Sequence, residues 1–122
     1  MLIAAIALAG VALAQQPESR PPDITLLKAN LGGDCSADFT VTGADGKPVY
    51  AATVHVRVRY GLLSIKRADL EIGTNSDGKA RIEGLPMKAR ALAYDIEKEG
   101  KKANVEQNVS SMCHANFHVS LK

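Results

Sequence analysis

The chain has 122 residues, a formal net charge of +2, two cysteines and no tryptophan. Its length fits one domain of ordinary size. A net charge this small gives no argument for nucleic acid or anionic lipid as a partner, and we expect no nucleic-acid binding.

The chain begins with an apolar run, residues 1–14, that ends in Ala-Leu-Ala before the polar Gln15. The run is shorter than the roughly 20 residues that span a bilayer, and the small-x-small ending is typical of a signal-peptidase site. We predict a cleaved signal peptide over 1–14, although no Lys or Arg precedes Arg20; an uncleaved anchor is the alternative. Residues 15–22 are polar and proline-rich, which predicts a flexible lead-in. The predicted domain is then 23–122, secreted or periplasmic, with no membrane span in the mature chain.

Alternation of apolar and polar residues dominates the rest of the chain. It is clearest in 53–60, where Val54, Val56, Val58 and Tyr60 share one face. Similar runs follow at 68–72, 80–82, 92–96 and 105–109, and 23–31 permits either an irregular edge strand or a short helical turn. Glycine-containing turns separate the runs, at Asp45-Gly46, Asp77-Gly78 and Glu99-Gly100. Seven or so short strands predict an all-β, Greek-key β-sandwich.

Two segments of this pattern are similar to a known family. Residues 41–54 read VTGADGKPVYAATV, and residues 74–86 read TNSDGKARIEGLP. They resemble the V-T-D-x-x-G-x-P-V-x-G-A-x-V and T-D-x-D-G-x-F-x-I-x-x-L-P blocks of the carboxypeptidase regulatory-like domains, which are transthyretin-type sandwiches. The resemblance implies a non-catalytic accessory domain that supports folding, spacing or contact with partners.

The stretches CSADFTV at 35–41 and CHANFHV at 113–119 share the frame C-x-A-x-F-x-V and hold the only cysteines and phenylalanines of the chain. Matching order in the same direction predicts that these first and last strands are parallel neighbours, with both cysteines at one end. Two cysteines in an exported chain indicate a disulfide. We therefore predict a Cys35–Cys113 bond.

Residues suited to catalysis or metal binding do not form a recognisable motif. His114 and His118 are four strand residues apart, about 13 Å, which is too far for one metal ion. His55 belongs to a different strand. Asn75-Ser76-Asp77-Gly78 has glycines, Gly73 and Gly84, where a calcium loop needs acidic residues. We predict no catalytic residue, no metal site, no cofactor and no enzymatic activity.

The family resemblance also raises one catalytic competitor, the transthyretin-like hydroxyisourate hydrolase. That enzyme ends in Y-R-G-S, whereas this chain ends in HVSLK at 118–122. Because this C-terminal motif is missing, the catalytic site of that enzyme cannot be assigned to this chain.

Two surface features remain as candidates for binding. Leu62 and Leu63 form an apolar hairpin tip, which suggests a protein-partner surface unless they fold over the end of the core. Tyr50 lies near a turn and is the one aromatic residue that the alternation does not place on the buried face. It is therefore a candidate contact for a glycan or other small ligand. Arg57 and Arg59 are expected to lie opposite Asp69 and Glu71, which would neutralise that strand pair.

The sequence therefore predicts an exported, non-enzymatic β-sandwich for protein interaction or structural support. The alternative is a module that binds a carbohydrate or a small ligand. The sequence does not identify the partner, the host biology or the oligomeric state.

Overall fold

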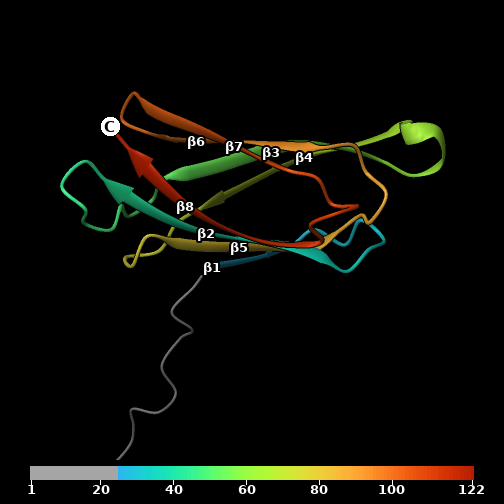
Figure 1. Ribbon diagram of the computed structural model, residues 1–122, viewed down its shortest axis with the longest axis horizontal. Coiled ribbons are helices and arrows are strands. Elements are labelled where there is room, and N and C mark those ends of the chain that lie inside the picture. Colours follow the sequence, from blue (N-terminus) through green and yellow to red (C-terminus); the bar gives the residue numbers. More distant parts are fainter. Residues whose placement is uncertain (1–24) are drawn as a thin grey trace, which may run out of the picture.

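The computed structural model describes residues 25–122, and the predicted signal peptide and lead-in lie outside them. It consists of two four-stranded sheets packed face to face (Figure 1). The first sheet has the order β1-β5-β2-β8 and the second the order β4-β3-β6-β7. The eight strands are β1 Thr25–Lys28, β2 Cys35–Gly43, β3 Thr53–Tyr60, β4 Lys66–Gly73, β5 Lys79–Leu85, β6 Leu92–Lys98, β7 Lys101–Gln107 and β8 His114–Leu121.

The core confirms the face assignment made from alternation. Val54, Val56 and Val58 are fully buried, whereas Arg57 and Arg59 between and beyond them are exposed. The inward side chains of both sheets form one cluster, as expected for a sandwich whose strands have one dry face. At its centre the rings of Phe39, Tyr94 and Phe117 pack together, with centroids 4.8 to 5.8 Å apart.

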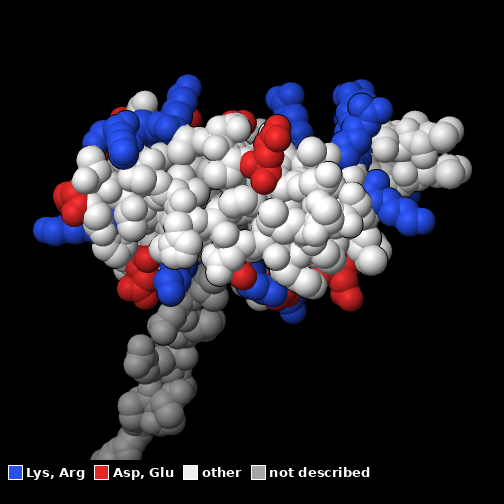
Figure 2. Space-filling view, viewed as in Figure 1, with Lys and Arg blue, Asp and Glu red and all other residues white. Residues whose placement is uncertain are grey.

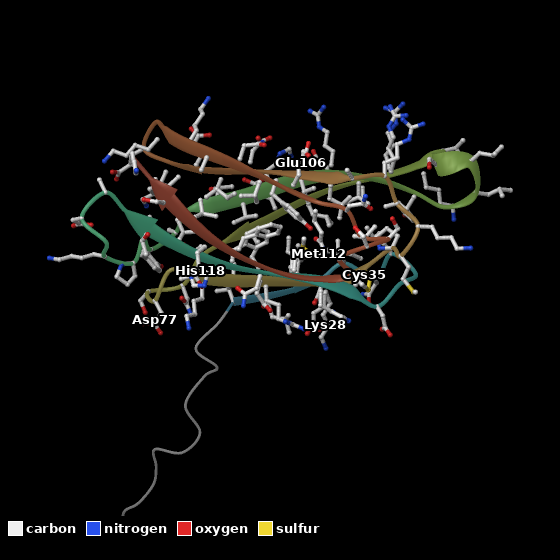
Figure 3. All side chains as sticks on the ribbon, viewed as in Figure 1. Lys28, Cys35, Asp77, Glu106, Met112 and His118 are labelled. Atoms are coloured by element: carbon white, nitrogen blue, oxygen red, sulfur yellow. A yellow bond between two sulfur atoms is a disulfide. The ribbon has the colours of Figure 1, made fainter. Side chains whose placement is uncertain are left out.

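The two similar stretches lie side by side in β2 and β8, which pair in parallel with Ala37 opposite Ala115 and Phe39 opposite Phe117. The pairing brings the cysteines together, and Cys35 and Cys113 form the predicted disulfide, with Cα atoms 4.6 Å apart. Figure 3 shows the bridge at the end of the sandwich near the start of β2.

The strand that begins at Cys35 is nevertheless the second one. Residues 25–28 form β1, an edge strand parallel to β5, so the helical alternative for this segment is wrong. Within residues 25–122 the structure contains no helix that is long and apolar enough to cross a membrane.

Candidate functional site

The most exposed apolar feature of the described chain is the turn between β3 and β4. Leu62, Leu63 and Ile65 have 81%, 84% and 73% of their surface exposed. We call these three residues the tip. The alternative that Leu62 and Leu63 fold over the core is therefore wrong: the turn projects beyond the end of the sandwich (Figure 1).

The backbone of the tip is a tight turn at the end of the β3–β4 hairpin. The strands end at the pair Tyr60 and Lys66, and a short 3-10 turn, η2 Leu62–Ser64, closes the hairpin. Leu63 and Ser64 both have positive φ, 58° and 55°. This conformation is unfavourable for residues other than glycine, so the turn holds two residues in a sparsely populated backbone region.

Basic side chains flank the tip, and the predicted neutralisation of this strand pair is only partly correct. Arg57 does lie opposite Asp69, but Arg59 lies opposite Arg67. Asp69 instead contacts Nε2 of His55, at 2.5 Å. Within residues 25–122, neither Arg59 nor Arg67 has an acidic partner within ion-pair distance.

Figure 2 shows the consequence on one face of the molecule, where lysine and arginine side chains border the uncharged projecting tip. An open groove of about 900 Å³ runs beneath the hairpin. Its walls include Lys66 and Leu62 on one side and the exposed Met87 and Lys88 on the other. The apolar tip and the lysine and arginine side chains that border it therefore form one continuous surface.

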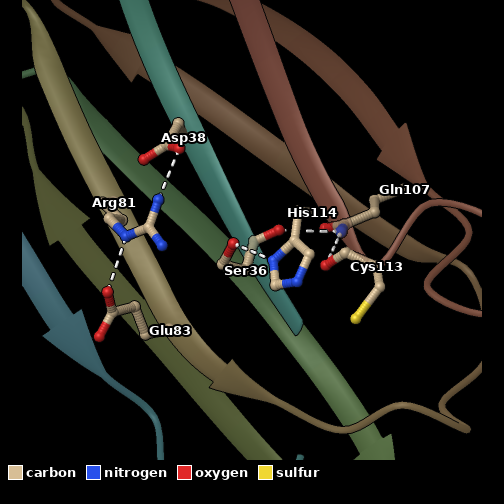
Figure 4. Close-up of polar contacts among 7 residues, drawn as sticks. All are labelled: Ser36, Asp38, Arg81, Glu83, Gln107, Cys113 and His114. Atoms are coloured by element: carbon tan, nitrogen blue, oxygen red, sulfur yellow. Dashed lines mark hydrogen bonds and ion pairs between the residues drawn. The ribbon is translucent and has the colours of Figure 1, made fainter. Parts of the chain in front are cut away.

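The outer face of the first sheet carries the densest polar contacts (Figure 4). Nη1 of Arg81 donates to Asp38 at 2.6 Å and its Nε donates to Glu83 at 2.8 Å. Hydrogen bonds to Glu83 and then Asp38 raise the pKa of Arg81. Beside them Ser36 Oγ and His114 Nδ1 are 2.9 Å apart. Arg81 is thus neutralised by two carboxylates, and Ser36 is 2% exposed, so this arrangement favours a structural role.

The histidines do not converge. His55 lies in β3 of the second sheet, whereas His114 and His118 lie in β8 of the first. All three alternate with buried neighbours, so the two sets point outward from opposite layers. Within residues 25–122 no group of three or more His, Cys, Asp or Glu side chains is placed to hold a metal ion.

The segment Asn75–Gly78 is a turn. Oδ1 of Asn75 accepts hydrogen bonds from the backbone amides of Asp77 and Lys79, both at 2.9 Å. Asn75 thus uses this oxygen to hold the chain reversal before β5.

Tyr50 lies at a second open groove, of about 470 Å³, at the other end of the sandwich from the tip. Tyr50 is 66% exposed, and it is the one exposed Phe or Tyr among residues 25–122. Lys47, Glu99 and Lys101 share the groove with it. The arrangement offers a single stacking surface with charged neighbours.

The buried side chain of Gln107 was not singled out by sequence reasoning. Its Oε1 accepts a hydrogen bond from the Tyr94 hydroxyl at 2.6 Å. Its Nε2 donates to the carbonyls of Ser36 and Met112, at 3.0 and 2.8 Å, with Cys113 at 3.3 Å. Gln107 thus joins the backbone beside both cysteines (Figure 4).

No protein-family model matches the sequence, and no curated protein matches it. Solved structures do resemble the fold. Catechol 1,2-dioxygenase from Acinetobacter sp. ADP1 matches with a TM-score of 0.56 and 13% identity, over 81% of this chain and 57% of the enzyme. The dioxygenase domain of a carbohydrate-binding fusion from Streptomyces sp. SirexAA-E matches with a TM-score of 0.51 and 12% identity, over 90% of this chain and 96% of that domain.

The shaft pilin spaA from Lactobacillus rhamnosus GG also matches, with a TM-score of 0.50 and 14% identity, over 73% of this chain and 47% of the pilin. The chain thus spans about half the length of the pilin and of the Acinetobacter enzyme. Identities this low show a shared β-sandwich fold and nothing about activity. The resemblance to carboxypeptidase regulatory-like domains stays a prediction.

Proposed function

We propose that the chain is an exported, non-enzymatic module of the carboxypeptidase regulatory-like type, a transthyretin-like Greek-key sandwich, which attaches to another surface through its tip. Export is supported by the sequence of residues 1–14 and by the Cys35–Cys113 disulfide, because such bonds persist in oxidising compartments. The separation of His55 from His114 and His118 supports a role other than catalysis.

One observation carries the interaction role: the apex of the hairpin presents Leu62, Leu63 and Ile65 to solvent. Hairpin turns are ordinarily polar, and leaving large apolar groups in water forgoes about 1.5–3 kcal/mol for each side chain that burial would gain. A partner that covers the tip recovers this free energy. We therefore assign the attachment surface to the tip.

The experiment compares wild type with a Leu62→Ser/Leu63→Ser variant by affinity capture from the envelope and soluble extracytoplasmic fractions of the host. Leu26→Ser is the matched control, because Leu26 is also exposed (46%) but lies on β1. We expect the tip variant to lose retained material and the control to keep it, with both showing wild-type unfolding curves. Equal retention by wild type and the tip variant would overturn the proposal.

A glycan or other small ligand is the second candidate, and the exposed ring of Tyr50 beside a groove favours it. One aromatic stacking surface is a minimal sugar site, so we rank this function below attachment through the tip. A Tyr50→Ala variant that lost retention on a glycan array, while the Leu62→Ser/Leu63→Ser variant kept it, would reverse the order.

A further inference from the structure

We propose that the tip binds an anionic lipid surface, with Leu62, Leu63 and Ile65 inserted into the interface and basic side chains against the phosphate groups. The inference rests on the proposed function, because it takes the tip as the attachment surface, and it commits that surface to lipid. The basic side chains are Arg59, Lys66, Arg67 and Lys88, which we call the collar.

The spacing along the hairpin matches the depth of an interface. Leu63 stands at the middle of the turn, and the collar positions Arg59 and Arg67 follow four residues away on each strand. At about 3.3 Å per strand residue, and less in the turn, these two arginines lie roughly 7–13 Å behind the apex. Interfacial apolar groups insert about 5–10 Å, to the boundary between headgroups and acyl chains. A tip inserted to that depth places Arg59 and Arg67 at the level of the phosphates.

The charge arrangement points to an anionic partner. Arg59 and Arg67 lie directly opposite each other, and like charges at such a pair destabilise a sheet. His55 holds Asp69, the acidic side chain next along β4. The repulsion between the two arginines therefore stays uncompensated within residues 25–122. Anionic headgroups would supply the missing negative charge.

The shape of the tip favours lipid over a protein. A stable protein–protein interface takes roughly 20–30 residues from each side, with a core enriched in aromatic residues. The tip is a narrow projection with three aliphatic side chains and no aromatic ring. Binding to an interface requires only inserted apolar groups together with cations attracted to anionic lipid. A protein that encloses the tip is the competing outcome of the test.

The net charge of +2 gives no hint of this surface. Acidic residues elsewhere, among them Glu97, Glu99 and Glu106, offset the basic ones in the total. The field near a membrane acts within about a Debye length, close to 10 Å at moderate salt, so the charges around the tip decide the interaction.

The first experiment measures binding of the full chain to vesicles by co-sedimentation. Vesicles of phosphatidylcholine alone are compared with vesicles that also contain phosphatidylglycerol. Residues 1–14 are the same in every variant, so differences between variants report on the tip. We expect wild type to bind the anionic vesicles more tightly, and the affinity to fall as salt is raised.

Four variants locate the binding. Each collar charge contributes about fivefold, so Arg59→Gln/Arg67→Gln should lower the affinity about 25-fold. Lys101→Gln/Lys102→Gln is the matched control, because it removes two exposed cations at the β6–β7 turn, at the opposite end of the molecule (Figure 1). The Leu62→Ser/Leu63→Ser variant should lose binding, and Leu26→Ser should keep it.

A Leu63→Trp variant gives a readout confined to the tip. The chain has no tryptophan of its own, so its emission reports on position 63 alone. A blue shift on adding anionic vesicles, absent with Trp placed at Tyr50 instead, supports insertion. Unchanged emission, or equal loss of affinity in both charge variants, would overturn the lipid assignment.

The outcomes separate this inference from the proposed function. Wild type could fail to bind anionic vesicles while the Leu62→Ser/Leu63→Ser variant still retained less material than wild type in the capture experiment. The tip would then be an attachment surface for a protein, and the lipid assignment would be wrong. If neither vesicles nor capture distinguished that variant from wild type, both proposals would be wrong.

Discussion

The Cys35–Cys113 disulfide offers the strongest test of how this fold is stabilised. The bond joins residues 78 positions apart, so in the unfolded chain it closes most of the described domain into a loop. In the chain-entropy model, a loop of this length reduces the entropy of the unfolded state by an amount equivalent to about 4.5 kcal/mol at 25 °C. Domains of this size have a total stability of about 5–15 kcal/mol. The bond should therefore provide a large share of the stability.

Two perturbations separate the cross-link from packing. Reduction by a phosphine leaves both cysteine side chains in place, whereas Cys35→Ala/Cys113→Ala also removes a sulfur atom from the fully buried position 35. We expect reduction to lower the free energy of unfolding by about 4.5 kcal/mol, and the double variant to lose about 1 kcal/mol more from the cavity.

The assay is urea denaturation followed by circular dichroism. With a slope of about 1–3 kcal/mol/M, the midpoint should move to lower urea by roughly 1.5–4.5 M on reduction, and the slope should rise because the unfolded chain expands. A loss below about 2 kcal/mol in both forms would refute the reasoning. It would mean that the reduced unfolded chain keeps enough structure to limit the entropy that the cross-link removes.

Three further predictions concern single side chains. Gln107→Ala should lower the free energy of unfolding by about 3 kcal/mol, measured in urea, because it leaves the Tyr94 hydroxyl and buried carbonyls without partners; a loss below about 1 kcal/mol would contradict this. Burial raises the pKa of Tyr94, so the unfolded state releases this proton first as the pH rises. Stability should then fall by up to about 1.4 kcal/mol per pH unit above about pH 10, and Tyr94→Phe should lack this component of the slope. Gly78→Ala should destabilise far more than Gly46→Ala in thermal melts: both positions have positive φ, but a Cβ at Gly78 would lie 2.4 Å from the Val41 carbonyl oxygen and one at Gly46 meets nothing within 4 Å. Equal melting temperatures for these two variants would exclude the steric explanation.

The sequence predicted the layers of the fold because alternation assigns faces directly. Val54, Val56 and Val58 could point inward only if Arg57 and Arg59 pointed outward, and the structure has them so. The repeated C-x-A-x-F-x-V frame contained further information, since two strands with the same order of small and large side chains match best when parallel. The four residues of β1 are too few for a pattern, which left that segment undecided.

Register was harder to predict than faces. A shift of two residues keeps every side chain on its own face, so the hydrophobic pattern cannot distinguish one even-numbered offset from another. The turn makes that choice: a five-residue connection from Tyr60 to Lys66 sets Arg59 opposite Arg67 and places Glu71 opposite His55. The expected pairing with an acidic residue was therefore correct for Arg57 but wrong for Arg59.

The hydrogen-bond partners of Gln107 could not be predicted from the sequence. Its partners include backbone carbonyls of Ser36, Met112 and Cys113, and backbone carbonyls occur along the whole chain. Only the tertiary fold places three of them around one amide. The one hint is that the alternation places this glutamine on the buried face at the end of a strand. That position indicates burial but does not identify its hydrogen-bond partners.

The tip and the most heavily cross-linked part of the molecule lie at the same end of the sandwich (Figure 3). The disulfide fixes the start of β2 to the residue before β8, and Gln107 joins β7 to both. The loop before β2 contributes Leu31 and Gly32 to the groove beneath the hairpin. The disulfide therefore fixes the end of the loop that forms part of this groove, because Cys35 follows Leu31 and Gly32 by only a few residues.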